Sequence, residues 1–220
     1  MDKPLTLRIL RTTRREPVRA YWQDFKITIP EEAYVLDALE AAWRRDSSLL
    51  FRHSCHHASC GSCGMRIQGR ERLSCITVAF DVARNGLLRL EPLRNFPIIA
   101  DLVVDTGVLS QKMERVHARV TQEVESSQRF VNCIECGLCI SACPVAATSS
   151  EYLGPAVLAA AQPNMELNDV RSLVQGPAGV WRCHSAFECT EVCPTGVDPA
   201  TAIMNLRKGL LMSVLKRKGN

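Results

Sequence analysis

Alternating apolar and polar residues predict paired strands at the start of the chain. The segments LTLRILR (5–11) and YWQDFKITIP (21–30) alternate in this way, whereas EEAYVLDALEAAWRR (31–45) has its apolar residues at helical spacing. Further on, MRIQGRERLSCITV (65–78) predicts a hairpin that turns at Gln68-Gly69, and GLLRLEPL (86–93) predicts another strand. The first half is therefore expected to be a small α+β unit with a cysteine-rich loop beside its helix.

The second half shows a different periodicity. From about Ile98 strand patterning stops, and apolar residues recur every three or four positions, as at Leu109, Met113, Val116 and Val120. We expect helices throughout, the last of them starting after Asp198-Pro199. The 220 residues suffice for two domains of about 100 residues each. The predicted fold is α+β, with a mixed strand-and-helix domain over 1–100 and then an all-helical domain over 101–220.

Charge and hydropathy exclude several classes of protein. The net charge of +4 comes from 27 basic and 23 acidic residues without a long basic run, so no nucleic-acid partner is expected. The N-terminal MDKPLTLRILRTTRREP is too charged for a secretory signal. The most apolar stretch, FPIIADLVVDTGVL, is interrupted by Asp101 and Asp105, so no transmembrane segment is expected.

Eleven cysteines suggest metal–thiolate chemistry. Their odd number, in a chain without an export signal, argues against a disulfide framework. They fall into three groups: Cys55, Cys60, Cys63 and Cys75; then Cys133, Cys136, Cys139 and Cys143; then Cys183, Cys189 and Cys193. Iron or zinc sites are therefore the first candidates for function.

The first group has the plant-type [2Fe–2S] spacing. Cys55, Cys60 and Cys63 follow the C-x4-C-x2-C pattern, and Cys75 supplies the distant fourth thiolate. A loop of this kind must wrap the cluster and point its backbone N–H groups at sulfur. Zinc bound by four cysteines is an alternative that the asymmetric spacing suits poorly. A Rieske centre with His56 and His57 as ligands is disfavoured, and both histidines are expected to be solvated loop residues.

The two later groups form an imperfect repeat. The run NCIECGLCISACP has the bacterial ferredoxin spacing, in which the fourth cysteine ligates the other cluster. The second copy, CHSAFECTEVCP, has Ala186 where its second cysteine would stand. We therefore expect a [4Fe–4S] cluster held by Cys133, Cys136, Cys139 and Cys193, and a [3Fe–4S] cluster, whose fourth corner lacks a thiolate at Ala186, held by Cys143, Cys183 and Cys189. A [4Fe–4S] cluster with a non-protein fourth ligand is the alternative.

The order of these motifs resembles the iron–sulfur subunit of the succinate dehydrogenase and fumarate reductase family. The resemblance covers essentially the whole chain, including NFPIIADLVVD and GVDPATAI. Together with the cysteine motifs it implies a plant-type ferredoxin-like (β-grasp) domain over 1–100 and an all-helical bacterial-ferredoxin-like domain over 101–220. It implies an electron-transfer subunit without a catalytic residue or substrate site of its own. The implied partners are a flavoprotein subunit that carries FAD and one or more membrane anchor subunits where quinone binds. The chain would then lie peripherally on the cytoplasmic face of the membrane.

Three features bear on the quinone. Many succinate dehydrogenases have a tryptophan where this chain has Thr148, whereas His184 matches a histidine that lies near quinone in some members. A histidine merely packed beside the cluster explains His184 equally well. The basic C-terminal segment RKGLLMSVLKRKG is more simply a helix with a solvated face than a membrane-binding surface.

A relay subunit of a soluble fumarate reductase or other flavin dehydrogenase is the alternative function, and a zinc-stabilised scaffold is a third class.

Overall fold

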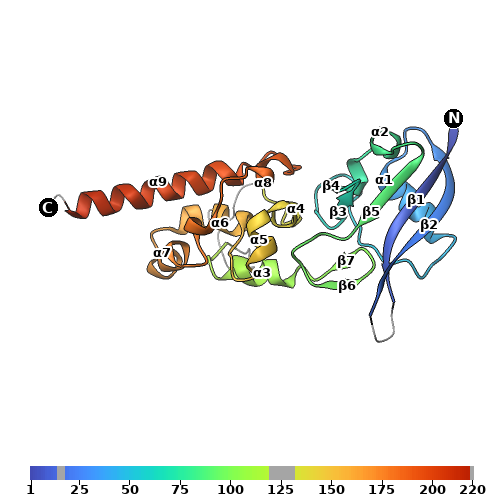
Figure 1. The fold of residues 1–220 in the computed structure, drawn as a ribbon. Coiled ribbons are helices and arrows are strands. Elements are labelled where there is room, and N and C mark those ends of the chain that lie inside the picture. The colour runs from blue at the N-terminus through green and yellow to red at the C-terminus, as the bar shows by residue number, and fades with distance from the viewer. Residues whose placement is uncertain (14–17, 119–131, 219–220) are drawn as a thin grey trace. The chain divides into compact units, whose positions relative to one another are not determined.

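The computed structural model describes residues 1–13, 18–118 and 132–218, with side chains as far as residue 215. It divides the chain into two compact units (Figure 1). The first comprises Met1–Asp105 with Cys136–Leu138, and the second comprises Thr106–Glu135 with Cys139–Asn220.

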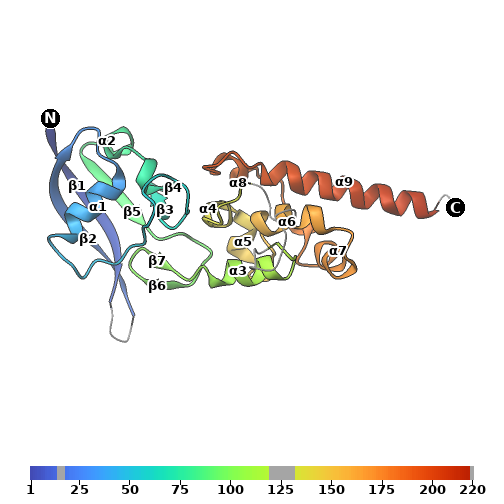
Figure 2. The same ribbon diagram turned by 180° about the vertical axis from the view of Figure 1, so that it is seen from behind.

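The first unit is built on a five-stranded sheet in the order β2-β1-β5-β3-β4. Its strands are β1 (Asp2–Thr12), β2 (Ala20–Pro30), β3 (Gly64–Ile67), β4 (Arg70–Leu73) and β5 (Leu87–Glu91). Strand β1 pairs antiparallel with β2 and parallel with β5, and β3 pairs antiparallel with both β4 and β5. Helix α1 (Val35–Trp43) lies behind the sheet in Figure 1 and in front of it in Figure 2, so it covers one face. This is the predicted β-grasp arrangement.

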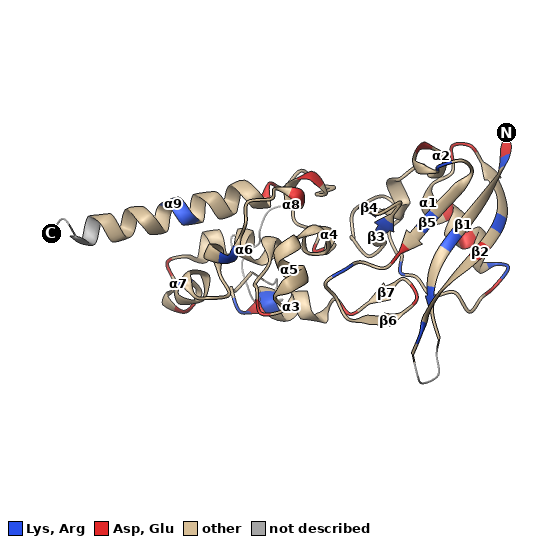
Figure 3. Cartoon of the chain, in the orientation of Figure 1, with Lys and Arg blue, Asp and Glu red and all other residues tan. Residues whose placement is uncertain are grey.

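The predicted alternation explains where the core of this unit lies. Apolar residues at alternate positions of β1 and β2 are buried, and they pack against the apolar face of α1. The strands contribute Leu5, Leu7, Ile9, Phe25, Ile27 and Ile29 to this core, and the helix contributes Val35 and Leu39. The intervening residues are mainly polar, with Leu10 and Trp22 as exceptions; most are intermediate in exposure in β1 and exposed in β2. In Figure 3, basic and acidic residues are interspersed along these strands. The strands, the helix and the hairpin predicted in this half are all present.

The hairpin of β3 and β4 turns where it was predicted. Gln68 and Gly69 both have positive φ, at 51° and 80°, as a two-residue turn between twisted strands requires. The short elements η1 (Ser74–Ile76) and α2 (Ala79–Val82) follow β4. The turn therefore leads from the loop that carries Cys63 to the segment that carries Cys75.

The prediction that strand structure ends near Ile98 is wrong. Strands β6 (Ile98–Ala100) and β7 (Val103–Val104) form an antiparallel pair, and the compact unit extends to Asp105. Asp101, in the turn between them, is almost fully buried and accepts hydrogen bonds from the N–H groups of Thr12 (2.9 Å) and Leu50 (3.0 Å). Its carboxylate also lies 3.0 Å from Nε of Arg11, so a buried ion pair ties this turn to β1.

Helices make up the regular structure of the second unit within its described residues. They are α3 (Gly107–Glu114), α4 (Leu138–Ala142, begun in the first unit), α5 (Pro144–Thr148), α6 (Pro155–Ala161), η3 (Gln162–Asn164), α7 (Asn168–Gln175), η4 (Val180–Arg182), α8 (Glu188–Glu191) and α9 (Pro199–Lys218). Every residue of α6 is buried, and α6 packs against α9. Leu109, Met113 and Val116 are buried as their spacing predicts, whereas Val120 lies outside the described residues.

The last helix starts at the predicted position. Asp198 precedes Pro199, and its Oδ1 accepts hydrogen bonds from the Thr190 hydroxyl (2.6 Å) and the Thr201 N–H (3.0 Å). Among the described residues, no helix is long and apolar enough to cross a membrane. The predicted solvated basic face does not hold for Arg207, which is half-buried and bonded to the protein, as described below.

Candidate metal centres

The first cysteine group lies in the loop that precedes β3 and in η1. The N–H groups of Ser59 and Cys60 point at Sγ of Cys55, at 3.2 and 3.3 Å, and the N–H of Ala58 points at Sγ of Cys75, at 3.4 Å. Gly61, with φ of 70°, gives the loop the left-handed turn that this wrapping needs. The loop therefore has the predicted property of directing backbone donors at sulfur.

The local environment shifts the pKa values of two thiols of this group in opposite directions. Backbone N–H donation from His57, followed by the Cys60 thiol and other loop amides, lowers the pKa of Cys55 to about 7. Burial, followed by the neighbouring Cys63 thiol, raises the pKa of Cys75 to about 11. Metal binding would have to expel the proton from Cys75, whereas Cys55 is half deprotonated near neutral pH.

The imidazole rings of the histidines in this loop contact groups other than the cysteine thiols. Ring nitrogens of His53 and His56 lie 3.0 Å apart, and Nδ1 of His57 contacts the Cys55 carbonyl. A carboxylate oxygen of Glu40 lies within 4.8 Å of the paired His53 and His56 nitrogens, and a hydrogen bond between the two rings accounts for their proximity. These contacts favour the solvated-loop interpretation of His56 and His57 over a role as ligands.

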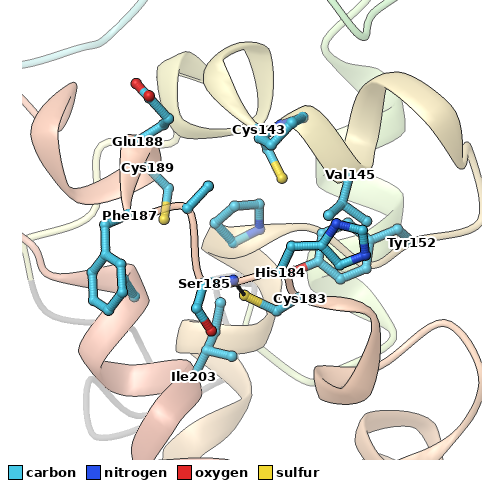
Figure 4. A pocket seen from close by; sticks show the side chains of 14 residues that line it. Cys143, Val145, Tyr152, Cys183, His184, Ser185, Phe187, Glu188, Cys189 and Ile203 are labelled. Carbon is cyan, nitrogen blue, oxygen red and sulfur yellow. Dashed lines mark hydrogen bonds between the residues drawn. The ribbon is translucent and has the colours of Figure 1, made fainter.

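The third and second groups share a cavity in the second unit. Cys143, Cys183 and Cys189 line a hollow of about 350 Å³, part of it open to solvent, together with Ala186 (Figure 4). We call it the three-thiol cavity. Cys143 joins α4 to α5, Cys183 follows η4, and Cys189 lies in α8. The structure thus brings together the three cysteines expected at one cluster and the alanine that replaces the fourth.

Two left-handed residues shape the wall of the three-thiol cavity. Ser185 and Phe187, on either side of Ala186, have φ values of 56° and 61°, which non-glycine residues adopt at some cost. The N–H of Ser185 points at Sγ of Cys183, at 3.4 Å. The backbone here coils around the thiols, as the loop of the first group does. His184 also lines the cavity.

Burial raises the pKa of two thiols in the three-thiol cavity. It raises the pKa of Cys143, and it raises that of Cys189 to about 11, with the neighbouring thiols Cys143 and Cys183 adding to the effect. Three thiolates in so apolar a site would repel one another without a cation between them. A metal or metal cluster is the group that compensates such charges.

Tyr152 provides an independent test of whether a cluster fits. Its side chain is 1% exposed and lines the cavity, but its hydroxyl has no hydrogen-bond partner of ordinary geometry. Burial, followed by the charges of Cys183 and Cys143, raises its pKa, and the hydroxyl lies close enough to the Cys183 thiol to be influenced by it without a well-formed bond. An unpaired buried hydroxyl facing three thiols fits a site built for a sulfur-rich group.

The four remaining cysteines are divided between the two units. Cys133, Cys139 and Cys193 belong to the second unit and are half-buried, whereas Cys136 belongs to the first. Glu135 and Gly137, on either side of Cys136, have positive φ, which is compatible with a chain that wraps a cluster. The assignment of these four cysteines to one [4Fe–4S] cluster stays a prediction, as does every individual ligand assignment.

Two cations that support the three-thiol cavity were not identified from the sequence. Nζ of Lys112 donates to the carbonyls of Ser150 (2.9 Å) and Tyr152 (2.6 Å). The guanidinium of Arg207 binds the carbonyls of Val180 and Cys183. Both cations come from helices distant in sequence from the groups they hold, so no local motif marks them.

Comparisons with known proteins agree with this arrangement. Residues 6–111 match a 2Fe-2S iron-sulfur cluster binding domain, and residues 129–197 match a 4Fe-4S dicluster domain. The fumarate reductase iron-sulfur subunit of Mycobacterium tuberculosis is 35% identical over 219 residues, which cover 89% of this chain and 88% of that protein. The chain belongs to the family of succinate dehydrogenase and fumarate reductase iron–sulfur subunits.

Other members extend the match to the whole chain. The fumarate reductase iron-sulfur subunit of Haemophilus influenzae is 32% identical, with 98% of both chains covered. The succinate dehydrogenase iron-sulfur subunit of Coxiella burnetii is 29% identical, with 94% of this iron–sulfur subunit and 97% of the relative covered. A chain of the structure titled "Mycobacterium smegmatis Sdh1 complex in the apo form" shares the fold, with a TM-score of 0.83 at 24% identity over 100% of this chain and 99% of that one.

Proposed function

We propose that this chain is the electron-relay subunit of a succinate:quinone oxidoreductase complex. In this function the clusters supply one-electron transfer between the FAD of a flavoprotein subunit and quinone at a membrane anchor. The complex would hold the chain at the cytoplasmic face of the membrane. Membership of the family supports the relay role, and the three-thiol cavity is the observation that carries the assignment of its terminal cluster.

The polypeptide positions and insulates the clusters. Cys55, Cys60, Cys63 and Cys75 would hold [2Fe–2S], with loop amides directed at two of the thiols. Cys133, Cys136, Cys139 and Cys193 would hold [4Fe–4S], and Cys143, Cys183 and Cys189 would hold [3Fe–4S]. We assign these sets to domains divided near residue 100, in line with the sequence-based boundary. No residue of the chain acts as a catalytic acid, base or nucleophile in this proposal.

Ala186 explains why the terminal cluster would have three irons. It lies in the wall of the three-thiol cavity, between Cys183 and Cys189, where a fourth thiolate would otherwise stand. An iron without a protein ligand at that corner is readily lost. His184 shares this wall, and we assign it to the quinone-proximal side of the cluster.

The experiment is to purify the complex with its partners and compare Ala186→Cys with wild type. Wild type should contain about nine iron atoms per chain and give a three-iron EPR signal when oxidised. The variant should contain about ten, lose that signal and pass electrons to quinone more slowly, because a cubane with four thiolates has a lower potential. Ala200→Cys places the same thiol elsewhere in the cavity wall and serves as the control.

The outcomes separate the candidate functions. Succinate-dependent quinone reduction by the purified complex supports the proposal. Flavin-linked activity in a complex that never reduces quinone would favour the relay subunit of a soluble fumarate reductase or other flavin dehydrogenase. An unchanged three-iron signal in a folded Ala186→Cys variant would contradict the position assigned to Ala186, and a colourless protein containing zinc would contradict the relay role altogether.

A further inference from the structure

The hydroxyl of Tyr152 is a buried donor that lies near the Cys183 thiol without a well-formed hydrogen bond. Tyr152 lies in the loop between α5 and α6, and its side chain is 1% exposed. Its ring lies in the wall of the three-thiol cavity beside Cys183 and His184 (Figure 4). No group of the described residues forms a hydrogen bond of ordinary geometry with its hydroxyl. Such groups are rare in folded proteins because burying an unpaired hydroxyl is unfavourable, so this one requires an explanation.

Sulfur is the acceptor that the cavity offers to this hydroxyl. The other polar side chains of the lining are those of His184, Ser185 and Glu188, and none of them forms a hydrogen bond with it. Val145, Pro155 and Ile203 present apolar side chains to the cavity. The Ser185 hydroxyl lies 3.4 Å from Nη1 of Arg207 and 3.7 Å from Sδ of Met204, so it is already occupied. The thiols themselves, once they bind iron, and the inorganic sulfide of a cluster are electron-rich acceptors.

The backbone holds the Tyr152 ring in place without help from a cluster. Nζ of Lys112 donates to the Tyr152 carbonyl at 2.6 Å, and the Tyr152 N–H donates to the Ser149 carbonyl at 3.3 Å. The next residue, Leu153, donates its N–H to the Ala178 carbonyl at 2.9 Å. The donor is therefore preorganised at the cavity wall before a cluster binds, as a residue that tunes a bound group should be.

We propose that the Tyr152 hydroxyl donates a hydrogen bond to a sulfur of the cluster held by Cys143, Cys183 and Cys189, and that this bond raises the reduction potential of that cluster. The inference rests on the proposed function, which places a cluster in the three-thiol cavity. Reduction adds negative charge to the cluster, so a donor to sulfur stabilises the reduced form more than the oxidised form. Tyr152 is thus a tuning residue that acts on the acceptor end of the relay.

The test compares Tyr152→Phe with wild type in the purified complex. Phenylalanine keeps the ring and removes only the donor. At a fixed ambient potential near the wild-type midpoint, the ratio of reduced to oxidised terminal cluster should fall about three- to tenfold. The other two clusters should titrate as before. Tyr34→Phe, at an exposed position in the first unit, is the control and should leave all three clusters unchanged.

A second measurement reads the hydrogen bond itself. Pulsed EPR of the wild-type terminal cluster in H2O and D2O should show an exchangeable proton coupled to it in addition to those of backbone amides such as the Ser185 N–H, and Tyr152→Phe should lack that additional coupling. The wild-type part of this measurement holds even if the variant fails to fold. An unchanged redox ratio in the variant, or no such additional exchangeable proton coupled to the wild-type cluster, would overturn the proposal.

The same measurements distinguish failure of this inference from failure of the proposed function. If the three-thiol cavity held a four-iron cluster, the titration would be followed on its reduced signal, and the expected shift for Tyr152→Phe would be the same. That result would correct the three-iron assignment and still support the hydrogen bond. Absence of any cluster bound by Cys143, Cys183 and Cys189 in the intact complex would overturn both.

Discussion

Arg207 should be required for the terminal cluster because it fixes the segment that carries Cys183. Its Nε and Nη2 donate to the Val180 carbonyl at 2.9 and 2.6 Å, and Nη2 also contacts the Cys183 carbonyl. The guanidinium carbon lies 5.9 Å from the centre of the Trp181 ring. One side chain from α9 thus holds both ends of the short stretch between η4 and the thiol.

The expected magnitude follows from these contacts. Hydrogen bonds from a charged donor contribute about 1.5–3 kcal/mol each, and Arg207 is half-buried, so we expect Arg207→Met to weaken the native arrangement of this segment by about 2–4 kcal/mol. That is roughly a 30- to 1,000-fold change in the equilibrium that presents Cys183 to a cluster. Methionine preserves the unbranched apolar stem, but it removes the contact of the guanidinium with the Trp181 ring together with its hydrogen bonds. Arg207→Lys keeps the charge but loses the planar fork, and its effect should be intermediate.

The assay is iron content and EPR of the purified complex after gel filtration. Arg207→Met should lose the signal of the terminal cluster, with iron falling from about nine toward about six atoms per chain, while the [2Fe–2S] signal stays at full intensity. Lys208→Met, the neighbouring exposed cation on the same helix, is the control and should retain all iron. Full retention of the terminal cluster in Arg207→Met would refute the reasoning.

Three further predictions address the first unit and the thiol chemistry. Cys60→Ser should damage only the [2Fe–2S] EPR signal, and loss of all clusters would contradict independent ligand sets. Asp101→Ala should lower the free energy of unfolding by about 2–4 kcal/mol in denaturant titrations, because it removes the buried partner of Arg11 and the acceptor of the Thr12 and Leu50 N–H groups while Arg11 keeps the partly exposed Asp46 at 3.3 Å. Asp24→Ala, in an exposed pair, should cost about 1 kcal/mol or less. In iron-free protein at pH 7, mass spectrometry should find that Cys55 is alkylated long before Cys189. With pKa values of about 7 and about 11, the Cys55 thiol is about half ionised and the Cys189 thiol is almost fully protonated. Equal alkylation rates would contradict these pKa shifts.

The fold of the first unit was predictable wherever its signals are local. The alternation in β1 and β2 sets which residues are buried, and the Gln68-Gly69 turn fixes the register of its hairpin. Strands β6 and β7 were missed because they are three and two residues long, and the two isoleucines of β6, Ile98 and Ile99, are at least half exposed. They depend on Asp101 and its buried pairing with Arg11, a contact 90 residues apart in sequence that no periodicity encodes.

The candidate metal centres were also predictable where their signal is local in the sequence, and the distant contacts that support them were not. Cysteine spacing reflects how a short loop wraps a cluster, so it identified Cys143, Cys183 and Cys189 as a set, and the structure places them around one cavity. Arg207 was interpreted as part of a solvated basic face because a basic C-terminal helix usually has one. Its bonds to carbonyls more than twenty residues earlier arise only from the packing of α9.

The two kinds of centre differ in where their hydrogen-bond donors come from. Around Cys55 and Cys75 the donors are amides of the same loop, so the motif that supplies the ligands also supplies the electrostatics. In the three-thiol cavity the Ser185 N–H of the same loop points at Cys183, and the hydrogen bond that we propose adds a side-chain donor from outside the cysteine motifs, Tyr152, whose carbonyl accepts from Lys112. Because hydrogen bonds to sulfur shift cluster potentials, proteins with identical cysteine spacing can relay electrons at different potentials. Substitutions at positions such as Tyr152 therefore allow the potential of the terminal cluster to change while its ligands stay the same.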